Sequence, residues 1–116
     1  KVTPMRKKIL LEWTTALCSG KYERAKAALR DKNGYCPMGI LCDLSQLDTW
    51  KEVDNNFYYL GKSKYLPEKV CEWAGITNNE KRNLIDFIIA YHDVLKYPFH
   101  KIAELILDKY KLKEDK

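Results

Sequence analysis

The sequence predicts a mainly α protein of the α+β class, built as one domain of five to six helices with a small β-hairpin. Two observations lead to this prediction. Apolar residues recur every three or four positions along most of the chain, as on one face of a helix. Only residues 57–66 are short, aromatic runs separated by a turn-like segment, which is typical of a hairpin. Because no linker or repeat interrupts the 116 residues, we expect a single domain over 1–116, with a frayed tail at 113–116.

The first third of the chain reads as two helices. The first is predicted over 4–17, where Pro4 suits a first turn and Gly20 follows the end. The second is predicted over 22–30, because apolar residues again recur at helical spacing. Asn33-Gly34 then predicts a tight turn.

The stretch YCPMGILCDL follows that turn and predicts a third helix, which begins at Pro37 and ends near Leu47. Its apolar residues Met38, Leu41 and Cys42 are expected to face the core. Gly39 has no side chain, so a neighbouring segment could approach the helix closely there.

The second half of the chain predicts the hairpin at 57–66 and then three more helices, at 67–74, at 78–94 and from Pro98 onward. A threonine and a glutamate at the start of the middle helix form a capping box. Because that middle helix is apolar over much of its circumference, we expect it to be the central and most buried one.

Composition bounds the function class. The chain is 46% hydrophobic and 32% charged, as in soluble globular proteins. No apolar run reaches the ~18 residues of a membrane span, and the basic start is not followed by the apolar core of a signal peptide. The four cysteines form no CxxC pair, so we expect reduced thiols in a cytoplasmic protein without metal or cofactor.

Several motifs, taken in order, resemble a small protein family carried by bacteriophages and bacteria. They are WTTALCSGKY, ALR, YCPMGILCDL, YLPEKVCEWAG and FHKIAELI, which together run from Trp13 to about Ile106. In that family the central motif usually reads close to Y-C-C-L-G-V-L-C-D, so Pro37 stands here where a second cysteine is common, and AYHD replaces L-N-D. No activity is assigned to the family. The resemblance implies a phage or mobile-element setting and a small cytosolic protein.

Cys36 is a candidate nucleophile, because a thiol at a helix N-terminus can be activated by the free backbone N–H groups there. Catalysis also needs a base, and the only histidines are His92 and His100, far along the chain. No flanking signature of a cysteine hydrolase accompanies Cys36. A buried structural cysteine is therefore the favoured interpretation, and we expect no enzyme.

A zinc site would have to use Cys36, Cys42, His92 and His100. The two cysteines are six residues apart in one predicted helix, which places their sulfurs on different faces, and no spacing of a known structural zinc module is present. We predict no metal site.

Nucleic-acid binding is the alternative function. Residues 1–35 hold nine Lys or Arg against three acidic residues, so the positive charge is concentrated there. FHKIAELI resembles the first helix of some helix-turn-helix units, but too little chain follows it for a turn and a recognition helix. The basic residues expected to contact phosphates are Lys7, Lys8, Lys21, Arg24, Lys26 and Arg30.

Protein binding is the favoured function. Aromatic residues gather on the predicted hairpin, and tyrosine and tryptophan are enriched in interface hot spots. They are Phe57, Tyr58, Tyr59 and Tyr65, with Trp50 just before the hairpin. We therefore expect a non-enzymatic accessory protein of phage type that binds a host protein or complex and inhibits or redirects it. Its oligomeric state stays open. The predicted contact residues are Tyr58 and Tyr59 of the hairpin and the basic residues Lys21, Arg24, Lys26 and Arg30.

Overall fold

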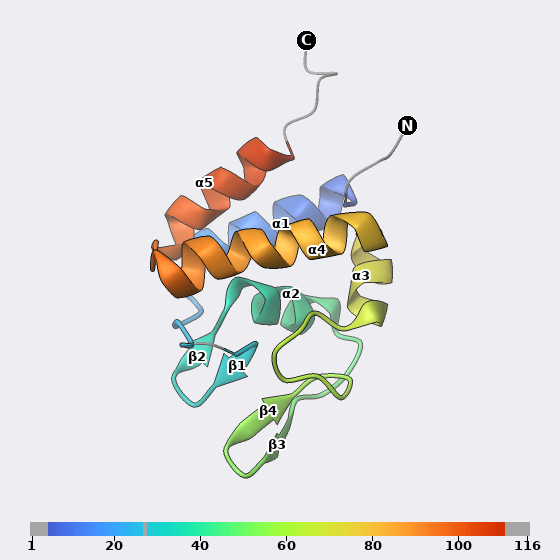
Figure 1. The fold of residues 1–116 in the computed structure, drawn as a ribbon, viewed down its shortest axis with the longest axis vertical. Coiled ribbons are helices and arrows are strands. Elements are labelled where there is room, and N and C mark those ends of the chain that lie inside the picture. The colour runs from blue at the N-terminus through green and yellow to red at the C-terminus, as the bar shows by residue number, and fades with distance from the viewer. Residues whose placement is uncertain (1–4, 27, 111–116) are drawn as a thin grey trace.

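A computed structural model describes residues 5–26 and 28–110 of the chain (Figure 1). The prediction of one mainly helical domain with a small β component is confirmed. The start of the first helix at Pro4 and the tail at 113–116 lie outside the described residues. The elements are α1 (Lys7–Cys18), β1 (Arg30–Asp31), β2 (Gly34–Tyr35), α2 (Pro37–Ser45), β3 (Lys51–Val53), β4 (Asn56–Tyr58), α3 (Glu68–Ala74), α4 (Asn78–Ile88), the π-helix η1 (Ile89–Val94) and α5 (Phe99–Lys109).

Helix α2 lies at the centre of the fold, and α1, α3 and α4 all pack against it. Figure 1 shows α1, α4 and α5 on one side of α2 and the two hairpins on the other. Seven of the nine residues of α2 are buried, whereas Leu84 and Ile88 are the buried residues of α4. The prediction that the helix over 78–94 is the central one is therefore wrong. Helix α4 buries only one apolar stripe, because charged residues occupy the rest of its surface.

Several local predictions are confirmed. Pro37 starts α2, with Cys36 as its extended N-cap residue. The hydroxyl of Thr77 accepts a hydrogen bond from the Glu80 N–H at 3.2 Å, as a helix N-cap should. Gly75 ends α3 in the left-handed conformation, with φ of 80°.

The predicted helix over 22–30 is wrong. Around Arg24 the backbone instead forms a single bridge to Tyr35, which lies just ahead of α2: the Ala25 N–H donates to the Tyr35 carbonyl at 2.9 Å, and the Tyr35 N–H donates to the Glu23 carbonyl at 2.7 Å. Gly34 permits this approach, because a Cβ there would overlap the Glu23 carbonyl. Long-range backbone pairing thus overrides a local helical pattern.

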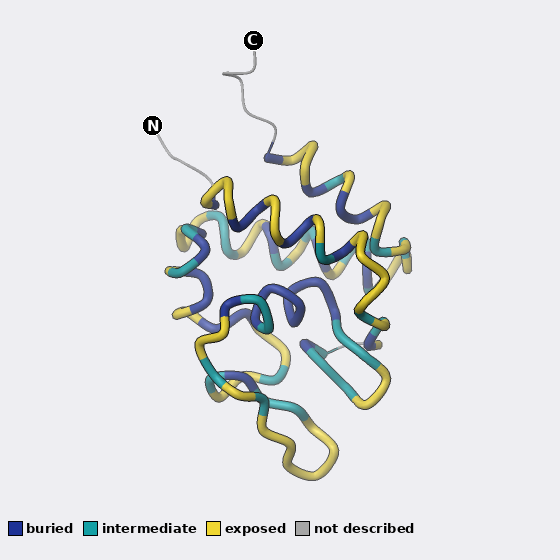
Figure 2. The backbone as a smooth tube through the Cα atoms, turned by 180° about the vertical axis from the view of Figure 1, so that it is seen from behind, coloured by how far each residue is buried: buried dark blue, intermediate teal, exposed yellow. Residues whose placement is uncertain are grey.

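The hairpin lies earlier than the 57–66 predicted. Strands β3 and β4 pair antiparallel with Val53 opposite Asn56, and the turn between them is Asp54-Asn55. Both turn residues have positive φ, 53° and 68°, as a type I′ turn requires. Beyond β4 a single bridge joins Tyr59 to Lys62, and residues 63–66 form no strand. Figure 2 shows that this hairpin projects from the body and is exposed over most of its length.

Candidate functional site

Four side chains meet where the two hairpins come together. The guanidinium carbon of Arg30 lies 5.0 Å from the ring centre of Tyr35, 5.4 Å from that of Trp50 and 4.6 Å from that of Phe57. All four residues are partly exposed. We call this set, Arg30, Tyr35, Trp50 and Phe57, the Arg30 cluster. Each of the three distances is within the range of a cation–π interaction.

The backbone explains why these residues meet. Arg30 pairs with Tyr35 across the first hairpin, so their side chains lie on the same face. Strand β4, which carries Phe57, lies beside β1. Trp50 immediately precedes β3 and packs edge-on to Tyr35, with ring centres 5.9 Å apart.

Asp43 of α2 holds two aromatic side chains of this region in place. Its two carboxylate oxygens accept hydrogen bonds from the Tyr22 hydroxyl at 2.8 Å and from the Trp50 indole N–H at 3.1 Å. Burial, together with the Asp43 carboxylate, raises the pKa of Tyr22 well above its ordinary value of 10.0. Tyr22 therefore stays protonated and keeps donating. The rings are anchored to the central helix of the fold.

The guanidinium of Arg30 has no hydrogen-bond acceptor or carboxylate partner within residues 5–26 and 28–110. The carboxylate of Asp43, which anchors the rings of this region, accepts its hydrogen bonds from Tyr22 and Trp50 instead. A partly exposed cation therefore stands among aromatic rings with its N–H groups unused. This is the arrangement that could recognise an anionic group.

The two predicted tyrosines have different environments. Tyr58 is half-buried in β4 and remains on the surface. Tyr59 is 1% exposed, and its hydroxyl accepts from the Asp48 N–H at 2.8 Å and lies 3.1 Å from the Ser45 hydroxyl. The expectation that Tyr59 contributes to a binding surface is therefore corrected: an extra turn at Leu60-Gly61 folds its ring into the core.

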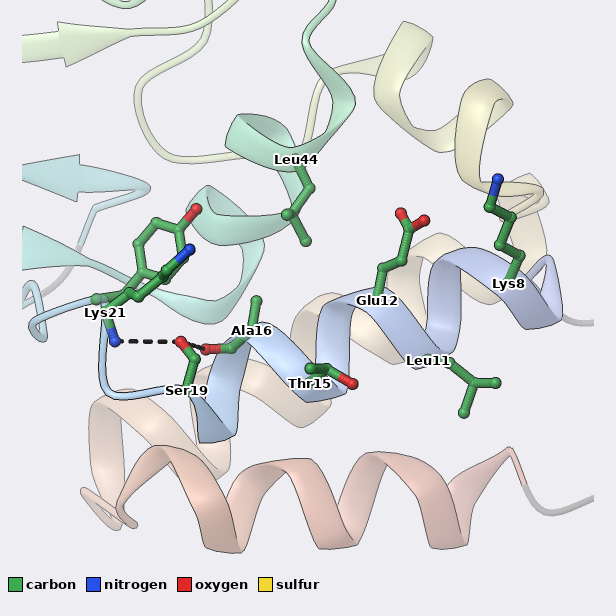
Figure 3. A pocket seen from close by; sticks show the side chains of 9 residues that line it. Lys8, Leu11, Glu12, Thr15, Ala16, Ser19, Lys21 and Leu44 are labelled. Atoms are coloured by element: carbon green, nitrogen blue, oxygen red, sulfur yellow. Dashed lines mark hydrogen bonds between the residues drawn. The ribbon is translucent and has the colours of Figure 1, made fainter.

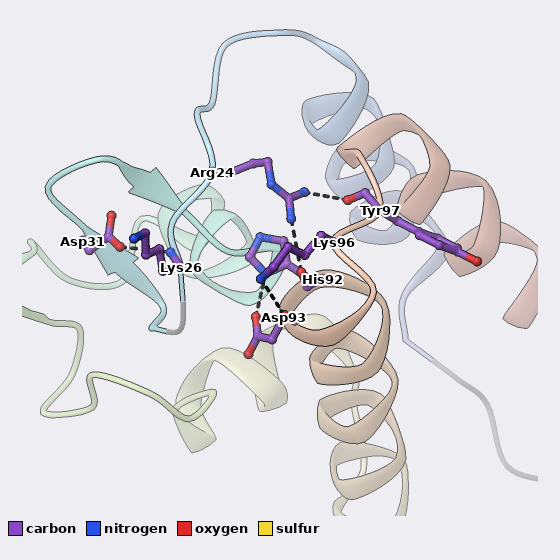
Figure 4. A network of polar contacts seen from close by, with 7 residues as sticks. All are labelled: Arg24, Lys26, Asp31, His92, Asp93, Lys96 and Tyr97. Atoms are coloured by element: carbon purple, nitrogen blue, oxygen red, sulfur yellow. Dashed lines mark hydrogen bonds and ion pairs between the residues drawn. The ribbon is translucent and has the colours of Figure 1, made fainter.

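The predicted basic residues do not form one face. Lys21 and Lys26 are exposed in the extended segment after α1. Arg24 is a structural residue, because it donates to the carbonyl of Tyr97 at 2.6 Å and to that of His92 at 3.1 Å, as Figure 4 shows. Among these basic residues only Arg30 joins the predicted aromatic residues, and because the described part of 22–30 is not helical, the predicted basic surface of two helices is not formed there.

Sequence reasoning placed Phe57 on the hairpin and Trp50 just before it, but missed the contributions of Tyr35 and Asp43. Tyr35 was read only as the start of the motif YCPMGILCDL. The tight turn predicted at Asn33-Gly34 lies one residue earlier, at Lys32-Asn33, and sets Tyr35 opposite Arg30. That turn was the signal that could have joined the two residues.

A second polar group surrounds His92, which is 1% exposed (Figure 4). Its Nδ1 lies 2.7 Å from an Asp93 carboxylate oxygen, its ring stacks on Phe99, and its Nε2 has no hydrogen-bond partner among the described residues. Burial lowers the pKa of His92 below its ordinary value of 6.5. His92 is therefore held neutral inside the fold.

Cys36 lacks the properties of a nucleophile. It is buried, and burial raises the pKa of its thiol to about 12, although the N–H groups of Met38 and Gly39 act in the opposite direction. Within the described part of the chain, no three His, Cys, Asp or Glu side chains lie close enough together to hold a metal ion. Neither finding supplies a catalytic centre.

An open groove of about 500 Å³ runs along α1 (Figure 3). Leu11, Ala16 and Leu44 give it an apolar surface, and Lys8 and Lys21 lie near its two ends. A second groove of about 630 Å³ lies between Tyr65 and the outer face of α4. Both are shallow surface features without a converging set of polar groups.

No helix in the described ranges has both the length and the apolar character needed to cross a bilayer. The sequence model of one protein family, described as a domain of unknown function (DUF8296), matches residues 5–110. No curated protein and no solved structure matches the chain.

Proposed function

Because the chain belongs to the DUF8296 family, whose description names no activity, we propose a function from its surface: the protein binds another protein, without catalysis, through the Arg30 cluster and the hairpin beside it. The observation that carries this proposal is the set of partly exposed aromatic rings held in fixed positions. Buried aromatic anchors supply much of the binding energy of protein interfaces.

Preorganisation favours binding at this surface. Hydrogen bonds to Asp43 fix Tyr22 and Trp50, and cation–π contacts connect Arg30 to the rings. Side chains that are already ordered lose little conformational entropy when a partner arrives. The projecting hairpin buries little of its own surface, so its residues are available for contact (Figure 2).

The setting of this function is also part of the proposal. The motifs from Trp13 to about Ile106 resemble a family carried by bacteriophages and bacteria. In such a setting the partner is a host protein or complex in the bacterial cytoplasm, and binding inhibits or redirects its activity.

The test is affinity capture from bacterial lysate, with and without nuclease, using the wild-type protein, Phe57→Ala and Tyr65→Ala. Tyr65 is a matched control, because it is 60% exposed and lines the groove beside α4, outside the Arg30 cluster. The wild type and Tyr65→Ala should retain the same protein after nuclease treatment, and Phe57→Ala should retain about tenfold less. Folding of each variant is checked by circular dichroism.

Three results would contradict the proposal. Wild-type protein that retains no specific protein argues against a protein partner at this surface. Capture that disappears on nuclease treatment identifies the partner as nucleic acid, the alternative function. Equal loss in Phe57→Ala and Tyr65→Ala would place the contact elsewhere on the molecule.

A further inference from the structure

We propose that Arg30 is a recognition site for a carboxylate, and that the partner presents an aspartate or glutamate side chain to it. This inference rests on the proposed protein-binding function and names the chemistry of the partner at one residue. It goes beyond that function because a surface of aromatic rings alone would not select for charge.

The geometry of the guanidinium carries the inference. Aromatic ring centres lie 4.6–5.4 Å from its central carbon, contributed by Tyr35, Trp50 and Phe57. Cation–π contacts of this kind hold a guanidinium in place without using its N–H groups as donors. Within residues 5–26 and 28–110, no oxygen accepts from these groups. The donors thus stay available to a planar anion, and a carboxylate can accept two of them at once.

Arg24 provides the contrast within the same chain. Its guanidinium also lies beside an aromatic ring, 5.6 Å from the centre of Phe99, but it donates to the carbonyl oxygens of Tyr97 and His92. Arg24 therefore has a complete structural role, closing the end of η1 against α5. Arg30 also lies beside aromatic rings, but no carbonyl or carboxylate among the described residues accepts a hydrogen bond from its guanidinium. Its N–H groups therefore remain available to a ligand.

Burial makes the site more selective than an ordinary surface arginine. Arg30 is partly buried, so some of its water has already been removed by the rings. A charge pair formed there is screened less than one in open solvent. Asp43 contributes negative charge nearby but has both oxygens occupied by Tyr22 and Trp50, so it orients the rings and does not neutralise Arg30 by a direct contact.

The charge around Arg30 favours a protein carboxylate over a nucleic acid. Residues 30–64, which contribute all four members of the Arg30 cluster, contain five Lys or Arg and five Asp or Glu, so this segment of the chain is neutral overall. Nucleic-acid binding depends on an excess of cations that contact several phosphates along a backbone. A single oriented arginine in a neutral, aromatic surrounding fits one acidic side chain flanked by apolar residues.

The experiment is an NMR titration of the ¹⁵N-labelled wild-type protein, in which the Nε–Hε signals of the arginines are followed. The probes are a blocked peptide of alternating Glu and Leu, the same peptide with Gln in place of Glu, and single-stranded oligo-dT. The Glu peptide should shift the Arg30 signal, and the Gln peptide should leave it unmoved. Arg82, an exposed arginine of α4, is the internal control and should shift far less.

Each other outcome overturns the inference. Equal shifts at Arg30 and Arg82 would show unselective attraction between charges. A shift with oligo-dT and none with the Glu peptide would assign Arg30 to a phosphate. No shift at Arg30 with any probe would show that its N–H groups do not receive an anion.

A charge-conserving substitution gives the second measurement. Arg30→Lys keeps the positive charge but loses the planar fork, so the Glu peptide should bind about tenfold more weakly. Arg82→Lys should bind like the wild type. If Arg30→Lys does not fold, the titration of the wild type still decides. A lysate partner retained equally by Arg30→Lys and wild type would refute the carboxylate site but leave the protein-binding function standing, whereas a wild type without a partner would refute that function.

Discussion

Gly39→Ala tests the closest backbone approach in the core. An alanine in place of an exposed helical glycine stabilises a protein by about 1 kcal/mol. Here the sign should reverse, because a Cβ at Gly39 would overlap the carbonyl oxygen of Leu29, which belongs to the segment leading into β1. A backbone oxygen cannot rotate away as a flexible side chain can.

The magnitude follows from what must move. The Leu29 backbone is fixed by two hydrogen bonds: its N–H donates to the Ser63 carbonyl at 2.9 Å, and its carbonyl accepts from the Cys36 N–H at 3.0 Å. Overpacking costs about 1–3 kcal/mol, and weakening these two bonds costs about 1 kcal/mol each. After the gain in helix propensity, the free energy of unfolding should fall by about 2–4 kcal/mol.

Urea denaturation followed by circular dichroism and tryptophan fluorescence measures this loss. Gly61→Ala is the control, because Gly61 has φ of 82° and nothing lies within 4 Å of an added Cβ, so that variant reports backbone strain without a clash. Its cost should be about 1–2 kcal/mol. A Gly39→Ala protein as stable as the wild type, or more stable, would refute the packing of Leu29 against α2.

Three further predictions concern buried groups. Tyr59→Phe should lower the free energy of unfolding by about 1–3 kcal/mol, because it leaves the Asp48 N–H without its acceptor and removes the contact with the Ser45 hydroxyl. Tyr58→Phe should change it by less than about 0.5 kcal/mol, and urea denaturation compares the two. In a thiol titration with an aromatic disulfide, the exposed Cys18 should react at once, whereas Cys36 should react only after denaturation, because burial raises the pKa of its thiol to about 12. Fast reaction of a second thiol in the native protein would contradict this prediction. Burial lowers the pKa of His92 below 6.5, so the unfolded chain binds a proton at His92 more tightly and the free energy of unfolding should fall as the pH drops below about 6.5. His92→Gln should reduce that fall, measured by urea denaturation at several pH values. The same dependence of stability on pH in wild type and variant would contradict a role for His92.

The sequence predicted those elements whose signals are local. Pro37, the Thr77 cap and Gly75 each mark a helix end by their own chemistry, and the structure places the ends accordingly. The fold class followed from the helical period of the apolar residues. These features need no knowledge of distant contacts.

The errors arose where distant contacts decide the local structure. Residues 22–30 have a helical pattern, but the backbone groups of Glu23 and Ala25 form hydrogen bonds with Tyr35. This pairing depends on the chain reversal between β1 and β2. Asp54-Asn55 carries a turn signal of its own, but the predicted hairpin placed its turn later, within residues 61–64. Because the hairpin was predicted too late in the chain, Tyr59 was assigned to it and expected on the surface, whereas it follows β4 and is buried.

The candidate site could be predicted only in part, because it joins four separate segments. Trp50 and Phe57 were found from aromatic enrichment, and Arg30 from the excess of basic residues, but nothing in either pattern sets the arginine among the rings. Their meeting depends on the placement of β1 beside β4. Such a contact between hairpins has no periodic signature.

Helix α2 connects the core to this site, which gives the motif YCPMGILCDL a structural purpose. Near its start, Gly39 admits the Leu29 carbonyl and so fixes the chain one residue before Arg30. About one turn later, roughly 6 Å along the helix, Asp43 accepts from Tyr22 and Trp50. One buried helix therefore fixes both the strand that carries the cation and the rings that surround it. A substitution at Gly39 should for this reason disturb the Arg30 cluster as well as the core, whereas Asp43→Asn should loosen the rings and leave the position of Leu29 unchanged.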